Sequence, residues 1–519
     1  MYKISPRQSM ITLVGLGIIF RMILGGTIGL GVDESYVVAI ARTFSLSYFD
    51  HPPLHFWIVW LTTHLTHSEN GLILRMPFIL LFAGTTWMMF RLGSKLFGEW
   101  AGVYAALAMN ISAVFGLSTG SWILPDGPLM FFMLATVLVL TRLFFSPGLK
   151  PAWLWMVAGM LLGFGLLSKY HAVFIAVGCF VFLVTSRSRR CLLLTTGPYI
   201  AFAVAMLVFL PVIIWNAEHN WISFLFQGGR GAAQGFYPGK MAANLAGQAA
   251  WILPWIWVPL VWSLIQGLAG GTGDYLRSEL QQRRWFLCCL AIGPIALFTL
   301  ATLWGAQGLF HWQAPGYLLA FPLLGAVVAE EIAAGRKLVR WWLNGSTAIF
   351  LIIVLVLGSH TATGWLRDAA PQWFVNGDPT AEAVDWHDLS VYLAEKGLVG
   401  ENKPFIVSAH WIDAGKIDYA LGGKLPLLCL NNSPHHFAFL HNQAAFRGQD
   451  AILIGRSHIM DNAVKMYQPY FETIEPYGQL SITRAGRPEF PVVLYYGRGF
   501  RANYPLPYER QHIIQGGGI

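Results

Sequence analysis

Charged residues are scarce in this chain. Asp, Glu, Lys and Arg account for 12% of its 519 residues, whereas about 25% is usual in soluble domains. The deficit falls on residues 1–360, which hold apolar runs long enough to cross a bilayer, while residues 361–519 have an ordinary soluble composition. The scarcity excludes a wholly soluble protein and predicts a polytopic α-helical membrane protein with a C-terminal extramembrane domain.

Several familiar motifs are also missing. The chain has five cysteines, and Cys429 is alone in residues 361–519, so no disulfide is expected within that domain. We find no P-loop, no dinucleotide-binding fingerprint and no internal repeat, so a nucleotide-sugar donor is not favoured. The basic residues lie in short loops between apolar runs, a distribution that does not indicate a nucleic-acid partner.

The apolar runs predict about eleven transmembrane helices, because a spanning helix needs about 20 apolar residues. The stretch "PPLHFWIVWLTTHL" (52–65) is too short and contains two histidines, so we expect an interfacial helix there. The eleven expected spans are 9–30, 72–91, 99–118, 127–145, 151–168, 171–186, 191–215, 249–268, 285–304, 313–333 and 341–360.

Basic residues mark one side of this arrangement, as cytoplasmic loops are enriched in Lys and Arg. With the N-terminus in the cytoplasm, every predicted inner loop is basic and the short outer loops carry few cations. This predicts transmembrane residues 1–360, outer loops at 31–71, 119–126 and 216–248, and a domain at 361–519 that faces the periplasm or the equivalent outer side. In that domain, residues 403–430 read strand, helix, strand, and "DAILIGR" and "FPVVLYYGRGF" read as further strands, which predicts a small α/β fold.

Ionisable residues gather on the predicted outer side. Asp33 and Glu34 follow the first helix, and Asp50 and Asp126 lie in outer loops. Lys169 is a cation at an outer helix end. Asp33 is also a good helix N-cap, and Lys169 could be a snorkelling interface residue. Together, a carboxylate base and a cation for a phosphate describe glycosyl transfer from a polyprenyl phosphate sugar.

Other candidates extend this cluster. A divalent metal shared by Asp33, Asp50 and Asp126 fits the residue types, and an ion-free mechanism is equally open. His435, His436 and His441 suggest a metal site only by their proximity in the chain, since no carboxylate or Cys joins them at ligand spacing. The outer side also carries the candidate substrate-binding residues His51, His171 and His219, and His311 is a further outer-loop candidate.

The order of these motifs over about residues 10–190 resembles the GT-C fold glycosyltransferases of the protein O-mannosyltransferase and aminoarabinose transferase type. The motifs are Asp33-Glu34, "YFDHPPL", "LRMPF", "LPDGPLMFF" and "LLSKY". The resemblance implies Asp33 as the catalytic base, with Glu34 and Asp126 beside it, and Lys169 and Arg75 as contacts of the donor phosphate. His51 stands where the aminoarabinose transferases carry Lys.

The resemblance implies an inverting glycosyltransferase that moves a sugar from a polyprenyl phosphate donor to an envelope acceptor on the periplasmic face. The acceptor classes left open are lipid A or lipopolysaccharide core, another glycan, and a secreted protein; membrane lipids are the other expected partners. The alternative is a transporter or flippase of a lipid-linked sugar. Transporters tend to show inverted repeats and ionisable residues near the midplane, whereas here the charges gather at one face and Arg21 is the exception.

Overall fold

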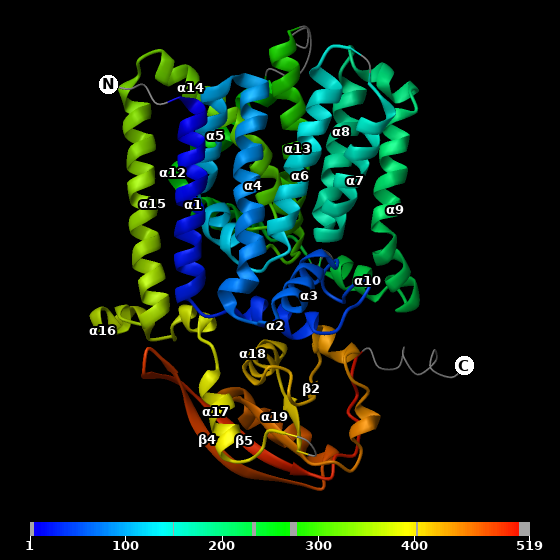
Figure 1. The fold of residues 1–519 in the computed structure, drawn as a ribbon, viewed down its shortest axis with the longest axis vertical. Helices are drawn as coiled ribbons and strands as arrows, with labels where there is room; N and C mark the ends of the chain where they lie inside the picture. The colour runs from blue at the N-terminus through cyan, green and yellow to red at the C-terminus, as the bar shows by residue number, and fades with distance from the viewer. Residues whose placement is uncertain (1–4, 149, 231–234, 270–277, 401–402, 508–519) are drawn as a thin grey trace.

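A bundle of long helices forms most of the molecule, and a smaller part built around a β-sheet lies at one end of it (Figure 1). The computed structural model describes residues 5–148, 150–230, 235–269, 278–400 and 403–507. Helix α1 (Pro6–Thr27) begins at the end of the bundle remote from the sheet. Its start is fixed by a capping box in which Ser5 and Gln8 bond each other's backbone N–H groups.

Seven helices of the described chain are long and apolar enough to cross a membrane, so the chain is a multi-pass membrane protein. Helices α11 (Pro238–Ile252) and α12 (Pro254–Ala269), bent by 109° at Leu253, make an eighth if the pair counts as one span. The seven are α1, α4 (Gly71–Phe97), α6 (Asp126–Phe145), α9 (Gly197–Glu218), α13 (Glu279–Ala301), α14 (Ala314–Ala333) and α15 (Lys337–Thr363).

The expected count of about eleven spans is not confirmed. Helices α5 (Glu99–Asn110), α7 (Ala152–Ser168) and α8 (Val173–Thr185) occupy the three remaining expected positions but are shorter than the others. Helix α5 ends early because the chain passes into a π-helical turn at Val114–Thr119. Between α7 and α8, the extended backbone of Lys169 (φ −160°, ψ 141°) ends the helix and turns the chain.

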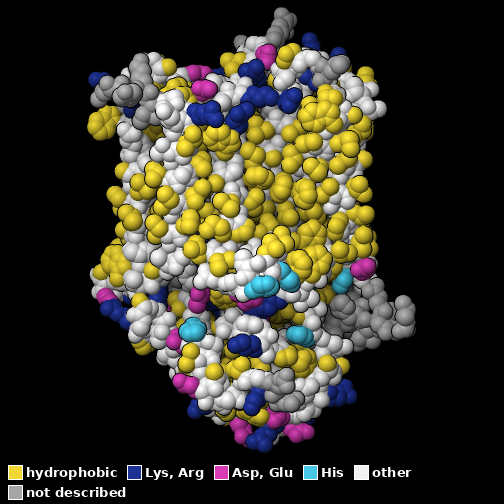
Figure 2. All heavy atoms as spheres, in the orientation of Figure 1, with side chains coloured by type: hydrophobic (Ala, Val, Ile, Leu, Met, Phe, Trp, Pro, Cys, Tyr) yellow, Lys and Arg dark blue, Asp and Glu magenta, His cyan; other side chains and the backbone are white. Residues whose placement is uncertain are grey.

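The surface divides along the bundle. Figure 2 shows hydrophobic side chains over the middle of the bundle and Lys and Arg gathered at the end remote from the sheet. Arg21 is buried inside the bundle and donates to the Asn110 side chain at 3.1 Å and to the carbonyls of Gly17 and Gly116 at 3.0 Å. These contacts give the intramembrane cation a structural role between helices.

The C-terminal part contains a five-stranded sheet in the order β2-β1-β3-β5-β4. Strands β1 (Phe405–Ser408), β2 (Leu427–Cys429) and β3 (Ala451–Arg456) are parallel, whereas β5 (Arg487–Arg498) is antiparallel to both β3 and β4 (Thr473–Arg484). The predicted strand–helix–strand and the two further strands are confirmed, with α18 (Trp411–Leu421) as the helix. The hairpin partner β4 was not predicted; its turn to β5 uses Ala485 and Gly486, both at positive φ.

Two short helices join the bundle to the sheet domain. Helix α2 (Val32–Ala41) packs against α18, and α3 (Leu54–Thr66) lies beside it at the end of the bundle. One hydrophobic core runs from Leu30 and Tyr36 to Trp386 and Ile417, so the two parts share buried surface.

Polar contacts hold the same junction. The buried ammonium of Lys416 donates to the carbonyls of Leu30 and Val384, and Arg42 pairs with both Glu69 and Asp418. The sheet domain is therefore fixed against α2, the helix that carries Asp33.

Candidate active site

A cavity of about 770 Å³ lies where the bundle ends meet α2 and the sheet domain. Six predicted site residues line it, and they come from segments far apart in the sequence. Glu34, Arg75 and His219, also predicted, are not among its lining residues. The six are Asp33, Asp50, His51, Asp126, Lys169 and His171.

Asp33 is an unpaired carboxylate in the first turn of α2. Its side chain is exposed toward the cavity, and within the described residues it makes no hydrogen bond or ion pair. Protein around it nevertheless limits solvation, which, with the charges of Asp50, Glu382 and Glu34, raises the pKa of Asp33 to about 6. A carboxylate with that pKa is ionised at neutral pH and is a stronger base than an ordinary Asp.

Asp50, unlike Asp33, is a buried carboxylate with hydrogen-bonding partners and a lowered pKa. It is buried and accepts a hydrogen bond of 2.7 Å from the Tyr36 hydroxyl, while His435 Nδ1 faces its other oxygen at 3.6 Å. Burial alone would raise the pKa of Asp50, but the contacts with His435, His51 and Tyr36 outweigh it and hold the pKa well below its usual range. Since the two carboxylates differ in this way, Asp33 suits proton transfer and Asp50 suits orienting neighbouring groups.

Lys169 is held by Asp126. Its ammonium lies 3.0 and 2.9 Å from the two carboxylate oxygens of Asp126, the first residue of α6. Asp126, predicted from the resemblance as a catalytic residue, is thus the ion-pair partner of Lys169. An ammonium has three N–H donors, so Lys169 keeps one for a ligand in the cavity.

Histidines surround this ion pair. Burial lowers the pKa of His51 to about 4 and, with the charge of Lys169, also lowers the pKa of His311 to about 4. His171 stacks on Phe298 with ring centroids 4.7 Å apart. At neutral pH His51 and His311 are therefore uncharged and can each offer one N–H and one acceptor to a ligand.

Arg230 also lines the cavity, although no role was predicted for it. Its guanidinium donates to Gln307 at 2.8 Å and lies 5.0 Å from the ring centroid of Trp312. It follows α10 (Ile222–Gly229) in the expected loop 216–248, of which residues 231–234 lie outside the described chain. A lone Arg in the Gly-rich run "QGGRG" was the available signal.

The sheet domain also contributes to the cavity. Trp411 and His435 line it, with their ring centroids 4.5 Å apart, and His435 faces the ring of Tyr36 at 6.0 Å. No catalytic role was predicted for residues 361–519; Trp411 was not a candidate, and His435 was considered only as part of a possible metal site. They are more than 350 positions from Tyr36 in the chain, and only the docking of α18 on α2 brings them together.

Glu34 and Arg75, which were predicted to have catalytic and phosphate-binding roles, form a buried ion pair outside the cavity lining. Arg75 donates to the Glu34 carboxylate at 2.8 and 2.5 Å and to the carbonyls of Gly25, Ile28 and Gly29. Glu34 also accepts from the backbone of Gly31 and Ile123. Burial acts to raise the pKa of Glu34, but Arg75 and these N–H donors lower it instead. Both groups are fully engaged, so the pair fixes the start of α2 against α1 and α4.

His219 also lies away from the cavity. Its ring stacks on Trp215 with centroids 4.0 Å apart, and its Nδ1 lies 2.7 Å from the Trp215 carbonyl oxygen. His219, predicted to bind substrate, therefore packs against the last turn of α9 and is not among the residues that line the cavity. His219 lies at the C-terminal end of α9, and the direction of its ring could not be predicted from the sequence.

The carboxylates do not assemble a shared metal site. Across the ranges that the structure describes, no group of three or more His, Cys, Asp or Glu side chains is placed to hold a metal ion. Asp126 is engaged by Lys169, and Asp50 by Tyr36. His435, His436 and His441 do not form such a group either. His436 Nδ1 instead accepts a hydrogen bond of 3.1 Å from the backbone N–H of Phe49.

Known proteins share this sequence pattern and fold. A family model described as dolichyl-phosphate-mannose-protein mannosyltransferase matches residues 50–215. The lipid A galacturonosyltransferase RgtD of Rhizobium johnstonii is 23% identical over 330 residues, which cover 60% of this chain and 64% of that protein, less than two thirds of its length.

Two solved structures are similar to this chain in fold. ArnT from Cupriavidus metallidurans, crystallised with undecaprenyl phosphate, has a TM-score of 0.62 at 13% identity, covering 93% of this chain and 97% of that one. The oligosaccharyltransferase AglB from Archaeoglobus fulgidus, in complex with an inhibitory peptide and a dolichol-phosphate, has a TM-score of 0.50 at 13% identity, covering 98% of this chain and 78% of that one.

Proposed function

We propose that this chain, which has the GT-C glycosyltransferase fold and resembles the protein mannosyltransferase and aminoarabinose transferase superfamily, transfers a sugar from a polyprenyl monophosphate to an envelope acceptor. The observation that carries the proposal is that a carboxylate without an ion-pair partner among the described residues, Asp33, and a cation, Lys169, line the same cavity. The names of the similar proteins support it, because ArnT was solved with undecaprenyl phosphate and AglB with a dolichol-phosphate.

The reaction follows from the position of these groups. Asp33 accepts the proton of an acceptor hydroxyl as its oxygen attacks the anomeric carbon of the donor sugar. The bond from that carbon to the phosphate oxygen breaks on the opposite face, so the anomeric configuration inverts. The departing polyprenyl phosphate gains negative charge, which the third N–H of Lys169 and the guanidinium of Arg230 stabilise.

The remaining lining residues position the two substrates. His51 and His311, uncharged at neutral pH, offer hydrogen bonds to sugar hydroxyls without adding charge. Asp50, fixed by Tyr36, faces the cavity from the side of the sheet domain together with His435 and Trp411. Aromatic rings, among them those of Trp122, Trp251 and Trp312, line the rest of the cavity. Such rings can pack against a lipid chain or against the face of a sugar.

The reaction takes place on the periplasmic side in this proposal. The basic cluster lies at the end of the bundle remote from the cavity. Because cytoplasmic loops are enriched in Lys and Arg, this end is the cytoplasmic one in the proposal. Periplasm-specific reporter fusions after Gly364, at the end of α15, should be active. Activity of a cytoplasmic reporter at this point would place the cavity on the wrong side for an envelope acceptor.

The function is tested by mass spectrometry of envelope glycolipids and glycoproteins from a deletion strain. We expect one sugar-modified species to disappear, to return with the wild-type gene and to stay absent with Asp33→Asn. The matched control is Asp461→Asn, an exposed position of α19 (Ser457–Tyr467) far from the cavity, and it should restore the species. An unchanged envelope in the deletion strain, or full restoration by Asp33→Asn, would count against the proposal.

A further inference from the structure

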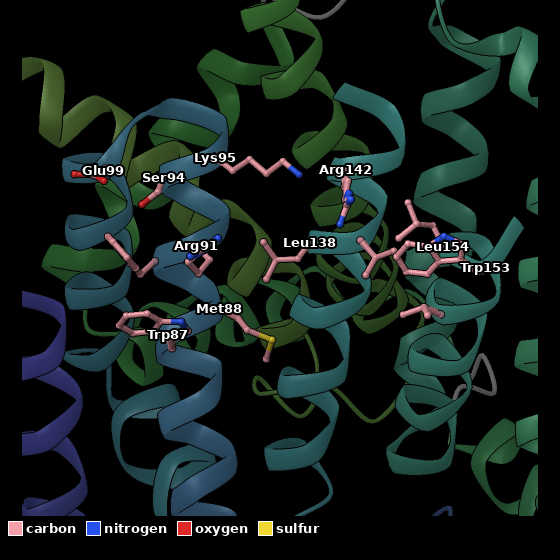
Figure 3. A pocket seen from close by; sticks show the side chains of 13 residues that line it. Trp87, Met88, Arg91, Ser94, Lys95, Glu99, Leu138, Arg142, Trp153 and Leu154 are labelled. Carbon is pink, nitrogen blue, oxygen red and sulfur yellow. The ribbon is translucent and has the colours of Figure 1, made fainter. Parts of the chain in front are cut away.

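A second large groove, of about 890 Å³, lies at the end of the bundle opposite the active-site cavity (Figure 3). It is formed by α4, α6 and α7. Two of these helices reach the active-site cavity with their other ends: α6 begins at Asp126, and α7 ends next to Lys169. The groove therefore belongs to the same rigid helices as the active site but is separated from it by the length of a membrane span.

Three cations from two helices converge on this groove. Arg91 and Lys95 come from α4 and Arg142 from α6, and Figure 3 shows the Lys95 side chain extending toward Arg142. Within the described ranges of the chain, no carboxylate forms an ion pair with any of the three. Glu99, the one acidic lining residue, starts α5 and lies on the other side of α4 in this view. The groove thus holds positive charge that has no carboxylate counterion among the described residues.

Apolar and aromatic side chains continue the groove toward the middle of the bundle. Trp87 and Met88 precede Arg91 by about one turn of α4, and Leu138 precedes Arg142 by one turn of α6. Trp153, with 54% of its surface exposed, stands 5.9 Å from the Arg142 guanidinium. Charged groups above an apolar channel, with Trp at the boundary, are the pattern of a membrane-interface lipid site.

We infer that this groove binds an anionic phospholipid, with the phosphodiester headgroup between Arg91, Lys95 and Arg142 and an acyl chain along Met88 and Leu138. The enrichment of basic residues near cytoplasmic span ends explains why cations lie at this end of α4 and α6, but it does not require three of them to line one groove beside apolar side chains. Charge complementarity selects the headgroup: three unneutralised cations favour a lipid with net negative charge over a zwitterionic one. A bound lipid would bridge α4 to α6 and so stabilise α6, which carries Asp126 at its other end.

The test uses the purified full chain in detergent, titrated with phosphatidylglycerol or with phosphatidylcholine. Native mass spectrometry counts the retained lipid, and the melting temperature reports stabilisation. We expect wild type to retain phosphatidylglycerol preferentially and to melt higher in its presence. Each cation near an anionic headgroup contributes about fivefold in affinity, or about 1 kcal/mol. The triple variant R91Q/K95Q/R142Q should therefore lose about a hundredfold.

A matched control carries the same change in net charge. Arg187, Arg190 and Lys337 are exposed cations outside the groove, so R187Q/R190Q/K337Q should bind phosphatidylglycerol like wild type. Equal losses in the two triple variants would overturn the proposal, because they would show a general attraction to the charged surface.

A second variant distinguishes binding of a lipid from binding of an inorganic anion, because it blocks the apolar part of the groove without removing any charge. Leu138→Trp should fill the apolar part of the groove and lower phosphatidylglycerol retention about tenfold while the three cations remain. If Leu138→Trp retains the lipid fully, or if millimolar inorganic phosphate displaces it from wild type, the groove is an anion site without a lipid chain and the inference fails. These readouts need no sugar transfer, so they stand apart from the proposed reaction.

Discussion

Replacing Glu34 by Gln should destabilise the protein strongly, although Glu34 adjoins the proposed catalytic base. The Glu34–Arg75 contacts of 2.5 and 2.8 Å are buried, with side-chain exposures of 3% and 2%. Removing one partner of such a pair leaves the other charge buried and costs about 3–5 kcal/mol. Gln keeps one acceptor oxygen, and Arg75 keeps three carbonyl partners, so we expect a loss near the lower end, about 3 kcal/mol.

Thermal unfolding in detergent measures this effect at a fixed scan rate. Asp33→Asn is the matched control, because Asp33 faces the cavity without a partner among the described residues; its stability should change by less than about 0.5 kcal/mol. In a double-mutant cycle, Glu34→Gln with Arg75→Met should be less destabilised than the sum of the single changes, by about 1–3 kcal/mol. The reasoning is refuted if Glu34→Gln melts like wild type and yet loses sugar transfer, since Glu34 would then act in catalysis.

The other predictions concern the cavity. Since Asp33 must be ionised to accept a proton and its pKa is about 6, kcat/KM should fall about tenfold per pH unit below pH 6; a flat profile from pH 5 to 8 would contradict its role as base. Lys169→Ala should lower kcat/KM for the donor about a hundredfold, with Lys169→Arg retaining part of it; loss of acceptor affinity alone would exclude a phosphate contact. His435→Phe keeps a ring against Trp411 but removes the imidazole facing Asp50. We expect about a tenfold lower kcat/KM, or about 1.4 kcal/mol, at an unchanged melting temperature; an unaltered rate would limit His435 to packing.

The positions of most site residues followed from sequence because membrane topology is a strong constraint. Once the basic loops fix one side, charged residues in the opposite loops must share the other side. Asp33, Asp50 and Lys169 were grouped in this way although they lie on separate segments, and all three line the cavity. The expected topology was therefore enough to group side chains that lie more than a hundred residues apart in the chain.

Side-chain direction was not available from the same reasoning. Successive residues of a helix point about 100° apart, so Asp33 faces the cavity while Glu34 turns inward to Arg75. Reading the two as one acidic motif assigned both to catalysis. The span count is not confirmed for a related reason: the extended backbone at Lys169 shortens the helices on either side, and hydropathy does not detect the backbone conformation of a single residue.

The contribution of the sheet domain depends on docking between distant segments. Trp411 and His435 reach the cavity because α18 packs on α2 and Lys416 bonds the Leu30 carbonyl. No local pattern around "SPHHF" distinguishes a cavity histidine from a surface one. Contacts of this kind appear only when the packing of the whole chain is known.

Single-turnover transfer from a polyprenyl phosphate sugar tests the central claim most directly. Purified Asp33→Asn and wild-type protein would be loaded with labelled donor, and donor binding and transfer to an envelope lipid extract measured separately. If Asp33 is the base on a cavity that holds the donor phosphate at Lys169, the variant should bind donor with the wild-type Kd and transfer sugar about 10²–10⁴-fold more slowly. Transfer by Asp33→Asn at the wild-type rate, or no transfer from the lipid-linked donor by wild type, would contradict the account.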